Sequence, residues 1–206
     1  MSAIRPSDFN LLPSELRKLR SLSTPSKIQR FLDAIPYHVA ETAWSPRRVL
    51  RERTAHCLEG AIFAAAALRV NGYPPLLLDL EAVRDSDHVI AVYQRESCWG
   101  AVAASNFSGL RYREPVYRSL RELAMSYFDD YFNLMGERTL RRFSRPVNLQ
   151  RFDRLNWMTT DEEVWFIPEH LVDILHTELL TKASQKQLVR VSARRLAAGK
   201  LGAVGY

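Results

Sequence analysis

The first part of the chain alternates apolar and polar positions with the period of helices. Apolar side chains recur every three or four residues in two stretches, namely Leu16, Leu19 and Leu22, and then Ile28, Phe31, Leu32 and Ile35. Thr24-Pro25 supplies a helix start, and Pro36 ends the second stretch because the residue before a proline disfavours helical angles. The pattern predicts a helical N-terminal segment over about residues 1–35, followed by a short basic helix after Ser45-Pro46.

The next segment, residues 54–69, is predicted to be a buried helix. Thr54 can cap its start, Ala61 to Leu68 are apolar on every side, and Asn71-Gly72 is a typical helix stop. Because no side of this helix is polar in its middle, we expect it to be surrounded by the rest of the protein.

Strands are predicted directly after this helix. LLLDLEAV (residues 76–83) and HVIAVYQ (88–94) are strand-like and are joined by a polar turn, and CWGAVAA (98–104) is a third candidate. Short connections of this kind favour antiparallel pairing. Further along, the pattern predicts a long amphipathic helix over 114–133, irregular structure over 136–160, a strand at 162–167 and a helix beginning at Pro168. We therefore expect a single α+β domain over 1–206, with a basic C-terminal extension over about 183–206 whose last residues fray.

Charge and cysteine content narrow the functional classes. The net charge is +6, but basic residues are spread along the chain without a nucleic-acid-binding motif, so nucleic acid is an unlikely partner. Two cysteines make no disulfide framework, no signal peptide is recognisable, and the longest apolar run has eight residues, too short for a membrane span. We expect a cytoplasmic protein with reduced thiols and no cofactor.

Cys57 and His88 are the strongest candidates for chemistry. Cys57 lies where the buried helix begins, and unpaired backbone N–H groups there favour a thiolate and can hold an oxyanion. His88 begins the second strand and is suited to act as general base and acid near neutral pH. Such a base needs a third group that fixes its tautomer, and Asn106, after the third strand, can supply an amide oxygen.

These residues resemble the transglutaminase-like superfamily of papain-like cysteine enzymes over about residues 40–110. Cys57 with LEGAIFAAAALRVNGYPP is similar to the family's cysteine helix and its "lLRalGiPar" ending. DHVIAVY is similar to the "HaWvev" strand and CWGAVAA to the "gW..vD" strand, with Ala103 where the family has aspartate. The resemblance implies a papain-like fold and thiol-dependent hydrolysis or acyl transfer through a thioester, on a peptide, protein or small amide. By analogy with Cys-His-Asn sites, Asn106 takes the third position.

Several alternatives stay open. Cys57 can be an inert core thiol, and Asn106 a plain turn residue. Trp44 can wall the cleft, donate its indole N–H to an oxyanion, or simply pack in the core. A metal site built from His56, Cys57, Glu59 and His88 is disfavoured, because neighbouring helical side chains point apart. Because the family aspartate is missing, the domain can also be an inactive binding or scaffold domain whose basic surface engages an acidic partner.

Overall fold

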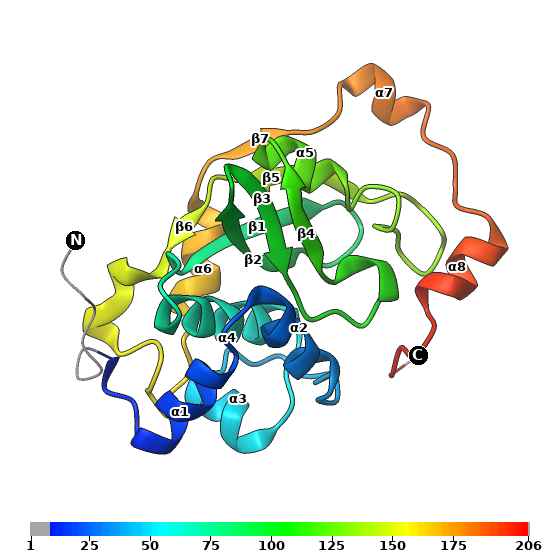
Figure 1. The fold of residues 1–206 in the computed structure, drawn as a ribbon. Coiled ribbons are helices and arrows are strands. Elements are labelled where there is room, and N and C mark those ends of the chain that lie inside the picture. Colours follow the sequence, from blue (N-terminus) through cyan, green and yellow to red (C-terminus); the bar gives the residue numbers. More distant parts are fainter. Residues whose placement is uncertain (1–8, 206) are drawn as a thin grey trace.

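The computed structural model describes residues 9–205, and the predicted helical segment therefore lies outside the described residues over positions 1–8. The chain forms an α+β fold in which helices pack on an antiparallel sheet (Figure 1). The helices are α1 (Pro13–Ser21), α2 (Pro25–Asp33), α3 (Pro46–Glu52), α4 (Cys57–Val70), α5 (Leu120–Met125), α6 (Phe166–Asp173), α7 (Lys182–Lys186) and α8 (Ala193–Gly199), with 3-10 helices η2 (Ser108–Leu110) and η3 (Leu149–Leu155).

The sheet has the strand order β4-β3-β2-β1-β5-β7, with β6 also paired to β1, and these strands pair antiparallel throughout. Its strands are β1 (Leu76–Ala82), β2 (His88–Arg95), β3 (Cys98–Val102), β4 (Arg113–Tyr117), β5 (Leu140–Ser144), β6 (Val147–Asn148) and β7 (His176–Glu178). The predicted hairpins of β1, β2 and β3 are confirmed, and these strands form the middle of the sheet.

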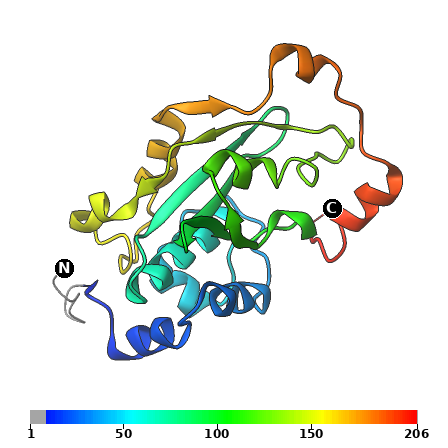
Figure 2. The same ribbon diagram turned by 45° about the horizontal axis from the view of Figure 1, so that its top comes forward.

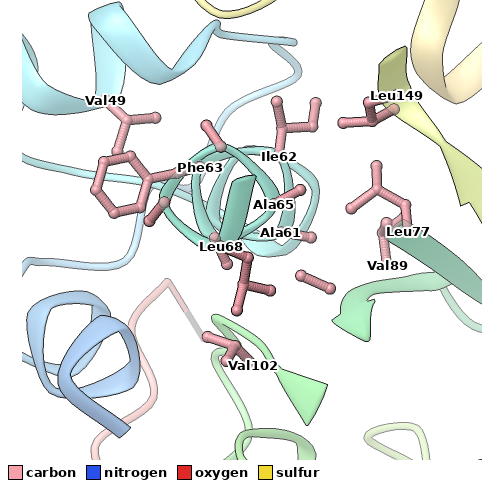
Figure 3. Packing of buried hydrophobic residues seen from close by; sticks show 14 of the residues in the cluster. Val49, Ala61, Ile62, Phe63, Ala65, Leu68, Leu77, Val89, Val102 and Leu149 are labelled. Atoms are coloured by element: carbon pink, nitrogen blue, oxygen red, sulfur yellow. The ribbon is translucent and has the colours of Figure 1, made fainter. Parts of the chain in front are cut away.

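Helix α4 is the buried helix that its sequence predicts, because every residue from Ala61 to Leu68 is 0% exposed. Viewed along its axis, α4 directs side chains toward every neighbour: Phe63 toward Val49 of α3, and others toward Leu77 and Val89 of the sheet (Figure 3). Its first turn lies close to the chain after β3, since a Cβ on Gly60 would come within 2.5 Å of the Cβ of Ala104. Burial on this scale makes α4 the centre of the larger core cluster.

The opposite face of the sheet carries a second core, formed by α5 and the aromatic turns that follow it. Leu78, Ile90 and Val92 of the sheet contribute to this core, together with Tyr127 and Tyr131. The sheet is thus covered on both faces, and β1 and β2 contribute apolar side chains to both cores.

The predicted long helix over 114–133 is wrong. Residues Arg113–Tyr117 form β4, paired with β3, and α5 begins only after Ser119, whose side chain accepts from the Glu122 N–H at 3.1 Å. The burial pattern along β4 alternates residue by residue, a strand period that five residues containing Pro115 display only weakly in sequence. Beyond Met125 the chain continues in short turns, and the Tyr131 hydroxyl donates to Ser86 O at 2.8 Å.

The predictions for 136–180 also need correction. Residues predicted as irregular include β5, β6 and η3, and the predicted strand over 162–167 instead leads into α6. The Val164 N–H donates to Ala43 O at 2.7 Å, while its carbonyl already accepts from the Ile167 N–H at 2.9 Å in the turn that leads into α6. The helix predicted from Pro168 ends at Asp173 because Ile174 is extended, and His176–Glu178 then pairs with β5.

Candidate functional site

Cys57 is the first residue of α4, at the end of the sheet where β2 begins. The backbone N–H groups of Val89 and Leu58 and the Tyr37 hydroxyl lie in hydrogen-bonding range of its sulfur, and all three favour the thiolate. The residue keeps part of its surface open to solvent, yet burial is the largest influence and raises the pKa of the thiol. The charge of Asp79 raises it further. The sequence predicted a lowered pKa at this helix start, and the structure gives the opposite direction, because desolvation outweighs the three donors.

The start of α4 is fixed by the buried carboxylate of Glu59, which is 0% exposed. Its oxygens accept from the Thr42 hydroxyl at 2.6 Å, from the His56 N–H and the His38 Nδ1 at 3.1 Å, and from the Trp44 N–H at 3.3 Å. Glu59 supports the helix start, as its position near the N-terminus suggested, and it also holds the loop before α3 against the turn that carries Cys57. A carboxylate with this many donors is expensive to remove.

His88 opens β2 and is 4% exposed. Its Nε2 lies 2.8 Å from the carbonyl oxygen of Leu110. A carbonyl only accepts, so Nε2 carries the proton and the neutral ring presents its lone pair at Nδ1. Burial lowers the pKa of His88 to about 4, with a smaller contribution from the positive charge of Arg113. At neutral pH the imidazole is therefore uncharged and able to accept a proton.

Cys57, His88 and Asn106 line one cavity of about 130 Å³. The edges of the Tyr127 and Tyr131 rings approach His88, with centroids 6.3 and 6.4 Å away. The three residues predicted from sequence are thus brought to one place, although they come from the start of a helix, the start of a strand and the loop after β3.

The side chain of Asn106 makes a different contact from the predicted one. Its Nδ2 donates to Val204 O at 2.8 Å, and its Oδ1 accepts from the Val204 N–H at 2.9 Å. The partner of His88 Nε2 is instead the Leu110 carbonyl. At Ala103, where the family pattern has aspartate, the side chain is buried, and the amide of Gln29 binds the backbone N–H and carbonyl of this residue at 3.1 and 2.9 Å.

Trp44 lies beside the site without lining its cavity. Its ring packs on that of His38, with centroids 4.2 Å apart, and the guanidinium of Arg48 lies over the Trp44 ring, 4.6 Å from its centroid. The indole Nε1 is buried without a hydrogen-bond partner in the described part of the chain. Trp44 therefore packs behind His38, which itself lines the second cavity beside Cys57.

Two parts of the site, the Leu110 carbonyl and Tyr37, have no recognisable signal in the sequence. The Leu110 carbonyl is a backbone group, and any residue in that position offers one. Tyr37, whose hydroxyl reaches the sulfur, follows Pro36 and is indistinguishable in sequence from a loop aromatic. Asp87 also lines the cavity, and burial above all raises its pKa to about 6.

A second buried histidine, His176, lies on the same sheet and is paired with Asp79. His176 of β7 has its Nε2 3.0 Å from Asp79 Oδ2, and its Nδ1 donates to Ile174 O at 2.8 Å. Both side chains are 5% exposed. The hydrogen bond to Asp79 is the largest cause that raises the pKa of His176. Local patterns in the sequence do not predict this pair, because Asp79 and His176 lie 97 positions apart.

The chain matches no protein-family model and no curated protein sequence. Within residues 9–205, no helix is long and apolar enough to cross a membrane. The same residues hold no group of three or more histidine, cysteine or carboxylate side chains arranged to bind a metal ion. The geometry around Cys57 is therefore the feature of the molecule that bears on its function.

Proposed function

We propose that the protein is a transglutaminase-like cysteine enzyme of papain-like fold, which hydrolyses an amide or transfers its acyl group through a thioester. One observation carries the proposal: a thiol at a helix start and an imidazole whose tautomer is set by a carbonyl line the same cavity. The substrate is a peptide, protein or small amide.

His88 acts as general base in this scheme. As the Cys57 sulfur attacks the amide carbon, the thiol proton passes to Nδ1, and the carbonyl oxygen becomes an oxyanion near the backbone N–H groups that begin α4. When the C–N bond breaks, the imidazolium returns the proton to the leaving amine. Water or an acceptor amine then attacks the thioester with the same base, which restores the thiol.

The directions of the two pKa shifts define the resting state. A raised thiol pKa and a lowered imidazole pKa both favour a neutral pair over a thiolate–imidazolium ion pair. The proton transfer is therefore uphill until a substrate carbonyl shares the developing negative charge. This makes the enzyme a base-assisted thiol rather than a preformed thiolate.

The pH profile of Cys57 acylation tests this mechanism. With p-nitrophenyl acetate as acyl donor, intact-mass detection of the acetylated protein gives the rate for Cys57, and Cys57→Ser defines the background. A thiol assisted by neutral His88 should react at a rate that is nearly independent of pH from about 5.5 to 8, since both groups keep their resting protonation states there.

The His88→Ala variant is the comparison. Its rate should rise about tenfold per pH unit, because only the small thiolate fraction then reacts. A wild-type profile with that same slope, or one that His88→Ala leaves unchanged, would remove the proposal.

The same pKa directions favour a second candidate, a non-catalytic peptide-binding domain that keeps the fold. An uncharged thiol and imidazole form a less polar pocket than an ion pair does. Under this alternative, Cys57 stays unacetylated in the native protein and becomes acetylated only after unfolding in urea.

A further inference from the structure

The chain after α8 returns to the site, where Val204 and Gly205 line a cavity together with Cys57. Helix α8 packs on η2, with the Ser108 hydroxyl donating to Ala198 O at 2.9 Å, and the chain then turns back toward the loop after α2. Both ribbon views place this red segment beside the loop that follows α2 (Figures 1 and 2). A Cβ on Gly205 would lie 3.4 Å from Val39, so the segment reaches from Asn106 to the loop over 37–41.

This segment borders a second cavity of about 490 Å³, which Cys57 also lines. Its lining includes Asn106, Val204 and Gly205 together with His38 and Val39 of the loop over 37–41. Cys57 and Asn106 line both cavities, so the two spaces meet at the thiol and at the residue that holds Val204.

The contact between Asn106 and Val204 is recognition of a peptide backbone. The amide binds both the N–H and the carbonyl of one residue, as a neighbouring strand would. The Val204 side chain is 46% exposed, so the contact depends little on its identity. Gln29 binds the backbone of Ala103 in the same bidentate way, but Gln29 is 5% exposed and belongs to the core, whereas the Asn106 contact is at the surface and can exchange.

We propose that Asn106 and the loop over 37–41 form a binding site for an extended peptide segment beside Cys57, and that residues 203–205 occupy this site in cis. The proposal rests on the proposed function in one respect, because it names an extended peptide as the substrate class. Bound there, residues 203–205 partly cover the approach to the thiol and compete with a peptide from another chain.

Two variants separate the parts of this proposal. Val204→Pro removes the N–H that Asn106 accepts, which releases the segment and leaves the site intact. Asn106→Ala releases the segment and also removes the site. Leu201→Ala, at a side chain that is 80% exposed, serves as the matched control.

Peptide binding is measured by fluorescence anisotropy, with a fluorescein-labelled synthetic peptide of the sequence KLGAVGY, which corresponds to residues 200–206. We expect Val204→Pro to bind it about tenfold more tightly than the wild-type chain, the effect of removing one competing hydrogen bond of the segment. Asn106→Ala should bind more weakly than Val204→Pro by at least that factor, and Leu201→Ala should match the wild type. Equal affinity of Val204→Pro and Asn106→Ala would overturn the proposed site.

Iodoacetamide alkylation of Cys57 gives a second measurement. Its rate should increase in both Val204→Pro and Asn106→Ala, and the peptide should slow it again only in Val204→Pro. An unchanged rate in both variants would show that the segment does not cover the thiol, contrary to the proposal.

The failure of the proposed function would look different. Cys57→Ser cannot form a thioester, but its anisotropy titration should equal that of the wild type. If acylation fails while the affinity pattern holds, the peptide site stands and the enzyme does not. If acylation succeeds while the affinity pattern fails, the reverse applies.

Discussion

His88 and His176 are two buried imidazoles on one antiparallel sheet, and their environments shift their pKa values in opposite directions. His88 donates to an uncharged carbonyl, and burial lowers its pKa to about 4. His176 contacts the carboxylate of Asp79, and this hydrogen bond raises its pKa. Burial is common to both rings, so the charge of the hydrogen-bond partner decides the direction.

The difference separates a group suited to chemistry from a group suited to stability. His176 beside the buried carboxylate of Asp79 resembles the orienting pair of a catalytic triad, but the cavity that Cys57 lines is at His88. His88, which lines the cavity with Cys57, has a carbonyl as the partner of its Nε2. A carbonyl fixes the tautomer but does little to stabilise the imidazolium, so the base stays neutral at rest.

The largest expected effect is the loss of Cys57 acylation when the imidazole of His88 is removed. His88→Ala should lower the rate of Cys57 acylation at pH 7 by about 10²–10⁴-fold, the usual contribution of a positioned general base. His176→Ala should leave the rate close to that of the wild type. The comparison fails if His176→Ala, measured on protein shown to be folded by circular dichroism, loses as much activity as His88→Ala.

The next effect is a loss of stability when Asp79, the partner of His176, is removed. Asp79→Ala leaves the ring of His176 buried without its partner, and we expect the free energy of unfolding to fall by about 3–5 kcal/mol in urea denaturation. The control is Asp161→Ala. It breaks the ion pair between Arg51 and Asp161, and the side chain of Asp161 is 64% exposed. That change should cost less than about 1 kcal/mol. Equal losses in the two variants would mean that burial adds nothing to the Asp79 pair.

The contributions of His88 and His176 to stability should depend on pH in opposite directions, because folding lowers the pKa of His88 and raises that of His176. The folded-state pKa of His88, about 4, lies below the unfolded value of 6.5, so the unfolded chain binds the extra proton first. The His88 contribution to stability is therefore complete above pH 6.5, and about 3 kcal/mol is lost as the pH falls to 4. Urea denaturation of wild type and His88→Gln across this range measures the difference.

His176 supplies the contrast for that experiment. Its pKa is raised in the folded protein, so its contribution is complete below pH 6.5 and is lost as the pH rises through the folded-state value. The stability difference between wild type and His176→Gln should shrink on the alkaline side, where the His88→Gln difference is flat. Two differences that change in the same pH range and direction would contradict the assignment.

The smallest effect is expected for Ser144, which binds the backbone of Asp79 and so supports the Asp79–His176 pair. The Ser144 hydroxyl, at a residue that is 0% exposed, accepts from the Asp79 N–H at 2.9 Å. Ser144→Ala should cost about 1–2 kcal/mol, because it leaves a buried N–H without a partner. The acylation rate at Cys57 should not change. A rate loss in this variant would show that the two rings are coupled through β1.

The parts of the fold that the sequence predicted are those set by neighbours along the chain. Helix α4 is apolar throughout its middle, and β1, β2 and β3 follow it with short turns, so their pairing could be predicted. Strands β5 and β7 pair across distant positions, as in Phe143 with Thr177, and short edge strands carry too few residues for a period to show. The long helix predicted over 114–133 failed for the same reason.

The site divides in a similar way. Cys57 and His88 could be predicted because their positions at the start of a helix and of a strand follow from local patterns. The contact of Asn106 depends on Val204, 98 positions further along, and the partner of His88 is a backbone carbonyl. The direction of the Cys57 pKa shift depends on how much protein surrounds the sulfur, which no local pattern gives.

Gly60 has a consequence for the geometry of the thiol. It lies three residues after Cys57, on the turn of α4 that approaches Ala104 so closely that a methyl group would overlap it. An alanine at this position would displace the first turn from the sheet at a cost of about 1–3 kcal/mol, which the fold can survive. The sulfur would move with that turn, away from the N–H of Val89. The depth of the nucleophile is thus set by the absence of a side chain, at a residue that lies outside the lining of both cavities.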